Sequence, residues 1–295
     1  MAERAADLRR PLVFVTGKGG TGKTTVAAAL AAAAGASVQA TADIDPDAAL
    51  GEWLARHAGA PVAAVLRRSR AFAYLVAAAP GAVELVKLGK LVDLAEQRPL
   101  VADGPSTGHA LAMLEAPRTF ARVAVAGPVK RDAEHVAQRL ADPAFTAYVA
   151  VTLPEPLAVD ELLELDRALP DTVGRGLDLV VVNAVHPDRF SDADAARLQA
   201  TGCPALAPVL AAHRRARREA EQVRRVRECV RAPVVELGFV YPPVAGARRI
   251  QRLARDLRPM VVPSSRRGDQ ASLTVAYSTR SATSMTASAI REPRR

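Results

Sequence analysis

Short apolar runs alternate with longer segments of helical periodicity along most of the chain. The short runs predict buried β-strands, and the longer segments predict helices between them. The apolar runs cover residues 11–16, 37–42, 98–102, 145–152, 177–182 and 233–237. The clearest helical patterns cover residues 23–34, 157–169, 189–201, 205–230 and 244–257. Strands that alternate with helices in this way predict an α/β fold with a doubly wound, mostly parallel sheet.

The alternation is interrupted once and stops before the chain does. Residues 51–95 have helical periodicity without a strand pattern, which predicts a small helical insertion packed on one side of the sheet. Residues 264–295 are rich in Ser, Thr and Arg and have little periodicity, so we expect a disordered basic tail there. The sequence therefore predicts one domain over residues 11–263.

Composition narrows the class of protein. Hydrophobic residues make up 49% of the 295 residues and charged residues 24%, which is typical of a globular protein. Only 4% of the residues are aromatic, which favours helices packed on a sheet over an all-β core. The two cysteines, Cys203 and Cys229, disfavour a disulfide framework or a structural zinc site. The charged first ten residues predict no signal peptide, and no apolar stretch is long enough for a transmembrane segment. We therefore expect a cytoplasmic location.

The net charge of +9 is confined to two segments. Residues 213–231 contribute +5 and the tail, residues 264–295, contributes +4. For the Arg cluster of residues 213–231, three interpretations stay open: a solvated helix face with ion pairs, a surface that binds nucleic acid or an anionic membrane, and a contact with an acidic partner. Because no aromatic residues are interleaved for base stacking, nucleic acid is the disfavoured partner.

The residues directly after the first predicted strand carry the most specific motif. Residues 17–25 read GKGGTGKTT and fit the P-loop pattern GxxxxGK[ST] between a predicted strand and a predicted helix. Glycines let successive N–H groups converge on phosphate oxygens, and the helix N-terminus adds partial positive charge. Lys23 is expected to reach the β- and γ-phosphates, and Thr24 to offer its hydroxyl to Mg²⁺. The predicted nucleotide-binding residues here are Gly17, Lys18, Gly19, Gly20, Thr21, Gly22, Lys23, Thr24 and Thr25.

Two acidic loops follow the second and third predicted strands. The first acidic loop comprises residues 42–46 (ADIDP), and a carboxylate there can orient the attacking water. Asp45 is our candidate and Asp43 the alternative. The same residues can also be explained as a simple Asp-Pro turn, and the two explanations are compatible. In the second acidic loop, residues 103–109 (DGPSTGH), Asp103 stands where a carboxylate holds Mg²⁺ beside a P-loop. Gly104 comes next, so no neighbouring glutamate can act as base, which favours Asp45. The predicted metal residues are Thr24, Asp45 and Asp103.

These motifs carry a family resemblance. The early Lys18 in GKGGTGKT resembles the deviant Walker A motif of the MinD, ParA, nitrogenase iron protein and ArsA group, and the second acidic loop resembles switch II of the ArsA branch. That branch contains arsenite-efflux and tail-anchored-protein-targeting ATPases, and short actinobacterial-looking members are the most similar. Residues 79–90 and 152–155 look like this branch too.

The resemblance implies a Mg²⁺-dependent ATPase that works as a dimer. Lys18 would reach the partner's ATP, Lys23 and Asp45 would be catalytic beside it, and Asn183, after the fifth predicted strand, would contact adenine. The pair would be a homodimer, or a heterodimer with a paralogous ATPase subunit, and its cycle would act on an unidentified cargo through the insertion. His109 would couple nucleotide state to the insertion rather than transfer a proton.

Some features depart from the branch and leave alternatives open. The lack of a cysteine trio disfavours metalloid binding, and four methionines in total disfavour a broad groove for transmembrane helices. A loop near residues 241–243 would close over the base. The family favours Leu-Pro there, whereas this chain has Leu237-Gly238. One alternative is a weakly or non-hydrolysing regulatory subunit of a heterodimer. Another is a ParA/MinD-like positioning ATPase that acts on DNA or membrane.

Overall fold

The computed structural model describes residues 8–70, 78–241 and 246–261. In these residues six strands form one sheet in the order β2-β3-β1-β4-β5-β6, and every neighbouring pair is parallel. The strands are β1 (Leu12–Thr16), β2 (Ser37–Ala40), β3 (Leu100–Asp103), β4 (Thr146–Thr152), β5 (Leu179–Val185) and β6 (Val234–Gly238). The predicted α/β fold with a doubly wound sheet is confirmed, and the sheet is parallel throughout.

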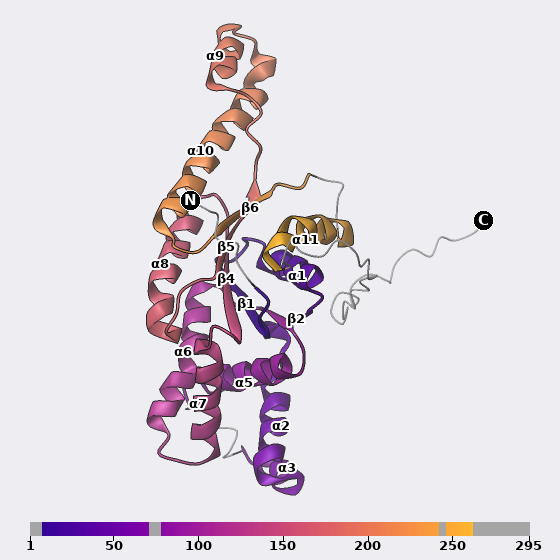
Figure 1. Cartoon of the computed structure of the whole chain (residues 1–295), viewed down its shortest axis with the longest axis vertical. Helices are drawn as coiled ribbons and strands as arrows, with labels where there is room; N and C mark the ends of the chain where they lie inside the picture. Colours follow the sequence, from indigo (N-terminus) through magenta and orange to yellow (C-terminus); the bar gives the residue numbers. More distant parts are fainter. Residues whose placement is uncertain (1–7, 71–77, 242–245, 262–295) are drawn as a thin grey trace, which may run out of the picture. The chain divides into compact units, whose positions relative to one another are not determined.

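Helices cover both faces of the sheet, as Figure 1 shows. The covering helices are α1 (Lys23–Ala34), α6 (Thr107–Val123), α7 (Pro128–Ala141), α8 (Pro156–Val173), α10 (Ala207–Cys229) and α11 (Ala247–Val261). Helix α9 (Asp192–Ala200) lies away from the sheet, against α10. Successive residues of β1 point to opposite faces: Val13 and Val15 join the core under α1 and α11, whereas Leu12 and Phe14 join the core under α6 and α7. Both faces are buried, which explains the apolar strand sequences without alternation.

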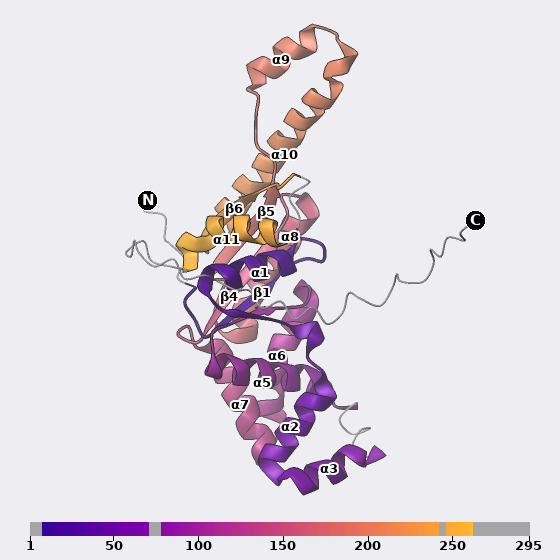
Figure 2. The same cartoon turned by 90° about the vertical axis from the view of Figure 1, so that its right-hand side faces the viewer.

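The predicted helical insertion lies between β2 and β3. It contains α2 (Pro46–Ala58), α3 (Ala60–Arg68) and α5 (Ala82–Gln97). Figure 2 shows α5 beside α6 and α7, with α2 against α5 and α3 at the far end of α2. Helix α5 also packs under the sheet through Leu88 and Leu91 in the same core as Phe14. The insertion is therefore joined to the core of the sheet and to the helix that follows β3. The predicted tail, residues 264–295, lies outside the described residues.

The second predicted strand ends two residues earlier in the structure than in the sequence pattern. Residues 37–42 were expected to be extended, but β2 ends at Ala40 and a 3₁₀ turn, η1 (Thr41–Asp43), follows. The side chain of Thr41 donates a hydrogen bond to the main-chain oxygen of Asp103 at 3.1 Å, which ties this turn to the end of β3. The turn thus brings the first acidic loop to the edge of the sheet where the P-loop lies.

The junction of β1 with the P-loop needs a glycine. Gly17 has a φ of 143°, and a Cβ there would lie 2.0 Å from the main-chain oxygen of Val151 in β4. The loop therefore leaves β1 in direct contact with the neighbouring strand. A side chain at this position would move either the loop or β4.

We expect Gly17→Ala to lower the free energy of unfolding by at least about 2 kcal/mol, because the backbone strain at this φ adds to a steric clash with β4. Gly19→Ala is the matched control, since a Cβ at Gly19 meets nothing within 4 Å, and its effect should stay below about 1 kcal/mol. Chemical denaturation followed by circular dichroism measures both. Equal losses in the two variants would contradict the steric explanation.

Candidate nucleotide-binding site

The P-loop is held in place by hydrogen bonds from its own side chains and from β5. Thr21 is almost fully buried, and its hydroxyl donates to the main-chain oxygen of Lys18 at 2.8 Å. The ammonium of Lys23 donates to the same oxygen at 3.1 Å. The amide nitrogen of Asn183, at the end of β5, donates to the main-chain oxygen of Thr21 at 2.8 Å. These contacts fix Gly17–Gly22 as a compact turn in front of α1, whose first residues are Lys23, Thr24 and Thr25.

The first turn of α1 contacts the end of β3 directly. The hydroxyl of Thr24 donates to Oδ2 of Asp103 at 2.6 Å, while Oδ1 of Asp103 is buried and has no hydrogen-bond partner among the described residues. Burial raises the pKa of the Asp103 carboxyl, and the hydrogen bond from Thr24 and the charge of Lys23 offset only part of that increase. Burial likewise lowers the pKa of the Lys23 ammonium, with Asp103 acting in the opposite direction.

This arrangement fits a hard divalent cation. Magnesium prefers oxygen ligands and is usually bound by one or two carboxylates or hydroxyls together with substrate phosphates. Thr24 and Asp103 supply such oxygens side by side, and the orphaned Oδ1 is a buried acceptor that a cation or its water would satisfy. The negative charge of Asp43 also acts on Asp103, so a second carboxylate lies close enough to matter.

Asp45, the predicted water-orienting residue, is the N-cap of α2. Its Oδ1 accepts the main-chain N–H of Asp47 at 2.9 Å, and its side chain is exposed. The structure therefore joins Thr24, Lys23 and Asp103 in one cluster, with Asp43 nearby, and gives Asp45 a capping contact in the adjoining loop.

Lys18 forms an ion pair within its own chain. Its ammonium donates to Oε1 of Glu161 in α8 at 2.6 Å, and Oε2 of Glu161 accepts the hydroxyl of Thr107 at 3.1 Å. The hydrogen bond from Lys18 is the main reason that the pKa of Glu161 is lowered. One carboxylate thus connects the P-loop to Thr107, which belongs to the second acidic loop and is the first residue of α6. Nothing in the sequence around Glu161 (VDELLELD) distinguishes it from an ordinary helical glutamate.

The second acidic loop is pinned against β1. The N–H of Gly104 donates to the main-chain oxygen of Val15 at 2.8 Å, and the hydroxyl of Thr16 donates to the main-chain oxygen of Pro105 at 2.9 Å. A Cβ at Gly104 would lie 2.6 Å from the oxygen of Val15. The close approach explains why a larger residue, such as a glutamate, does not follow Asp103. His109 is exposed, and its Nδ1 lies 3.4 Å from the hydroxyl of Ser106.

The residues that follow β5 and β6 form an aromatic cluster. His186 stacks on Phe239 with ring centroids 4.6 Å apart, and Tyr241 meets Phe239 edge-on at 4.9 Å. Ala184 has a positive φ of 61°, a strained conformation for a residue with a Cβ. Pro242 and Pro243, in the loop expected to close over a base, lie outside the described residues. Asn183 itself is engaged with the P-loop, a contact that sequence reasoning missed.

The Arg cluster is largely ion-paired. Arg215 pairs with Glu219, Arg224 with Glu221 and Glu228, and Arg227 with Glu236 in β6. Further pairs join Arg217 to Asp188 and Asp192, and Arg225 to Asp160. The geometry favours the solvated, ion-paired face among the three interpretations.

None of the helices in the described part of the chain has the length and apolar character needed to span a lipid bilayer.

Comparison with known proteins identifies the family of this domain. Residues 12–262 match the family model of the CobQ/CobB/MinD/ParA nucleotide binding domain. "Putative ATPase Mb3704" of Mycobacterium bovis and "ATPase BagA" of Mycobacterium tuberculosis are each 30% identical over an alignment of 234 residues, which covers 63% of this chain and 68% of the relative. The glycine-rich turn before α1, the parallel sheet and the family match agree, and the chain belongs to the CobQ/CobB/MinD/ParA nucleotide-binding domain family.

Proposed function

We propose that the chain is an ArsA-like, Mg²⁺-dependent ATPase that works as a dimer. The observation that carries the proposal is the contact between Thr24 and Asp103 beside the ammonium of Lys23, with one buried carboxylate oxygen of Asp103 left without a partner. Two oxygen ligands and a cation at the N-terminus of a helix are what a metal-bound triphosphate requires. The match of relatives named as ATPases supports hydrolysis.

Each residue of the site has a defined task in this proposal. The backbone N–H groups of the P-loop bind the phosphates, and Lys23 leaves the oxygen of Lys18 to neutralise their charge. Thr24 and Asp103 would hold Mg²⁺, which supplies charge neutralisation of the phosphates when bound. A carboxylate of the first acidic loop orients the attacking water; Asp45 is the main candidate and Asp43 the alternative. The aromatic cluster of His186, Phe239 and Tyr241 offers a face for adenine near Asn183.

Lys18 is the residue that makes the proposed site depend on a second chain. To reach a partner's nucleotide it has to leave Glu161, which also holds Thr107 at the start of α6. Dimer formation would therefore free the carboxylate that restrains the second acidic loop. The partner would be a second copy or a paralogous ATPase subunit.

The insertion is connected to the phosphate site by a short chain of contacts. The ammonium of Lys87 in α5 donates to the main-chain oxygen of Thr41 at 3.1 Å, and the hydroxyl of Thr41 donates to the main-chain oxygen of Asp103. Helix α2 begins directly after its cap, Asp45, and α6 begins four residues after Asp103. A change at either acidic loop therefore moves a helix of the insertion or its neighbour, through which a cargo would be handled.

A second candidate function is a regulatory subunit that binds ATP but hydrolyses it weakly. Two observations favour it: the carboxylate of Asp45 is engaged as a helix cap, and Lys18 is engaged within its own chain. The two candidates differ in what the purified chain does alone, and the ATPase measurements below separate them.

We expect the purified chain to hydrolyse ATP with Mg²⁺ and to dimerise when nucleotide is added. Lys18→Ala and Asp45→Asn should each reduce kcat by about 10²-fold or more, because one loses charge stabilisation and the other loses the water-orienting carboxylate. Because Asn also caps α2, Asp45→Asn should change the free energy of unfolding by less than about 0.5 kcal/mol. Steady-state hydrolysis and light scattering measure both properties.

The matched controls for these variants are Lys130→Ala on α7 and Asp47→Asn, which remove the same charges outside the site. Full activity in both controls would attribute the losses to the site. A full-rate Asp45→Asn together with a silent Asp43→Asn would transfer the water-orienting role to Asp43. ATP binding by a monomer without turnover would sink the homodimeric ATPase and favour the regulatory subunit.

We expect Asp103→Asn to raise the melting temperature of the protein measured without nucleotide and magnesium, and to abolish the magnesium dependence of ATP binding. The first effect follows because burial disfavours the charged carboxylate, as its raised pKa shows, and a neutral amide removes that cost. The second follows because the cation loses its anionic ligand. Differential scanning calorimetry and calorimetric titration measure the two effects. A lower melting temperature would show that the contacts with Thr24 and Lys23 outweigh desolvation.

A further inference from the structure

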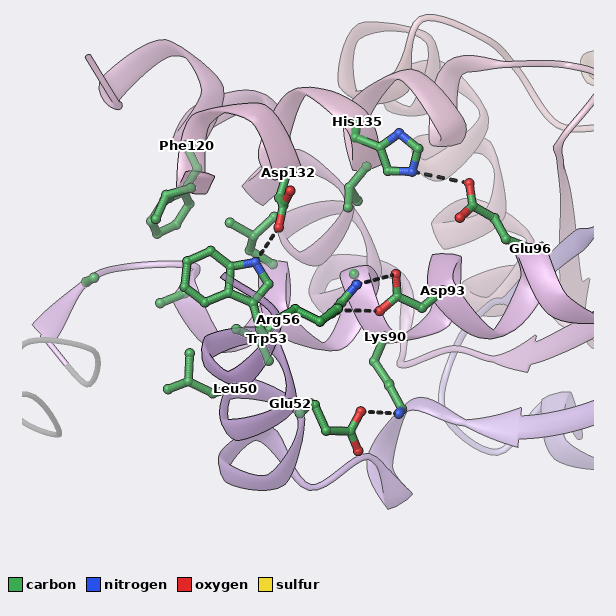
Figure 3. Close-up of a pocket in the computed structure, with 18 residues that line it drawn as sticks. Leu50, Glu52, Trp53, Arg56, Lys90, Asp93, Glu96, Phe120, Asp132 and His135 are labelled. Carbon is green, nitrogen blue, oxygen red and sulfur yellow. Dashed lines mark hydrogen bonds and ion pairs between the residues drawn. The ribbon is translucent and has the colours of Figure 1, made fainter. Parts of the chain in front are cut away.

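A cavity of about 420 Å³ lies between the insertion and the helices that follow the second acidic loop. Its walls come from α2, α5, α6 and α7, and Figure 3 shows the side chains that line it. The phosphate-binding residues described above are not part of its lining. The cavity is therefore a separate feature from the nucleotide site, although its walls include the helix that begins at Asp45.

The charged groups around the cavity are paired with one another. Arg56 and Asp93 form a two-fold contact with N–O distances of 2.7 and 3.2 Å, and Lys90 pairs with Glu52. His135 lies 3.2 Å from Glu96, which Arg139 also contacts at 2.7 Å. Figure 3 shows the pairs of Arg56 with Asp93, Lys90 with Glu52 and His135 with Glu96. Because each charge already has a partner of opposite sign, a charged ligand would gain less here than beside an unpaired charge.

The rest of the lining is apolar and contains two aromatic rings. The indole N–H of Trp53 donates to Asp132, so its polar atom is satisfied as well, and its ring stacks on His57 with centroids 4.6 Å apart. The second ring, Phe120, belongs to α6 and is labelled in Figure 3. The apolar side chains of the lining include Leu50, Trp53, Leu85, Val86, Phe120 and Val136.

We propose that this cavity is a binding site for a compact, uncharged, apolar or aromatic molecule. Its volume lies within the range of about 300–1,000 Å³ that is usual for small-molecule pockets. The paired rim offers no unsatisfied charge for a phosphate or a carboxylate, whereas the Trp53 and Phe120 rings offer stacking surface. A bound apolar molecule gains from burial against these walls without the cost of desolvating a charge.

The position of the cavity gives such a ligand a route to the nucleotide site. Lys87 of α5 is bonded to Thr41, and Thr41 is bonded to Asp103, whereas α2 starts at the cap residue Asp45. The assignment deepens the proposed function, since it specifies the chemistry of the cargo that the insertion would handle. Binding itself requires no ATP turnover, so the two proposals can fail separately.

The test uses Trp53, which is the single tryptophan of the 295-residue chain. The probe is N-phenyl-1-naphthylamine, a neutral aromatic fluorophore that accepts excitation energy from tryptophan. Titration of the full chain, excited selectively at tryptophan, should give saturable quenching of Trp53 and sensitised probe emission with a stoichiometry of one. ATP binding is measured on the same samples by calorimetry.

Gly89→Leu is the variant that fills the cavity. Gly89 lines it from the middle of α5, and a Cβ there would meet Val136 Cγ2 at 3.9 Å, an ordinary van der Waals contact. Replacing a helical glycine also favours the helix. The matched control is Ala212→Leu, which adds apolar volume to an exposed position of α10. We expect Gly89→Leu to weaken probe binding about tenfold or more, equivalent to about 1.4 kcal/mol, and Ala212→Leu to leave it unchanged.

Three results would overturn the proposal. The first is that a chain able to bind ATP does not bind the probe. The second is that Gly89→Leu leaves probe binding unchanged, or that the probe binds without energy transfer from Trp53. The third is concentration-dependent association of the chain that Gly89→Leu abolishes in light scattering, since a second copy would then occupy the cavity. Probe binding by a chain that fails to bind ATP would retain the cavity and reject the ATPase.

Discussion

Asp103 is the residue on which the arrangement of the nucleotide site depends. Its carboxylate accepts the hydroxyl of Thr24 from the P-loop helix, and its main-chain oxygen accepts the hydroxyl of Thr41 from the turn after β2. The next residue, Gly104, is bonded to Val15 in β1. One position at the end of β3 therefore connects both acidic loops with the P-loop. Since the carboxylate is buried with one unpartnered oxygen, the connection is made at an energetic cost that a metal-bound nucleotide would relieve.

The parts of the fold that could be predicted from the sequence are those encoded locally. The apolar runs marked the strands, and the spacing of Gly17, Lys23 and Thr24 marked the P-loop, because a strand, a tight turn and a helix start follow each other directly. The end of β2 was placed two residues too late, since its pattern does not contain the bond from Thr41 to a residue 62 positions away. That kind of contact is visible only when the sheet has been assembled.

The same limit applies to the side chains that complete the site. Lys18 was recognised from its place in the loop, whereas Glu161, its partner, lies 143 residues later in a helix with an ordinary acidic pattern. Asn183 was expected near a base, and the structure engages its amide with the main chain of Thr21, 162 residues away. For the Arg cluster the sequence left three interpretations open, and the structure favours the ion-paired face because distant residues such as Asp160 and Glu236 add to the acidic partners within α10.

The ion pair between Lys18 and Glu161 is weak enough to be exchanged. The side chain of Lys18 is 28% exposed to solvent and that of Glu161 is 32% exposed. An ion pair of that exposure contributes about 0.2–1 kcal/mol. A charge-assisted bond from the same ammonium to a phosphate in a water-poor interface contributes about 1.5–3 kcal/mol. The balance favours the phosphate, so Glu161 can hold Lys18 in a single chain without preventing its transfer to a partner. In the proposed dimer, this transfer would leave Glu161 with only Thr107, and the second acidic loop would then respond to the second chain.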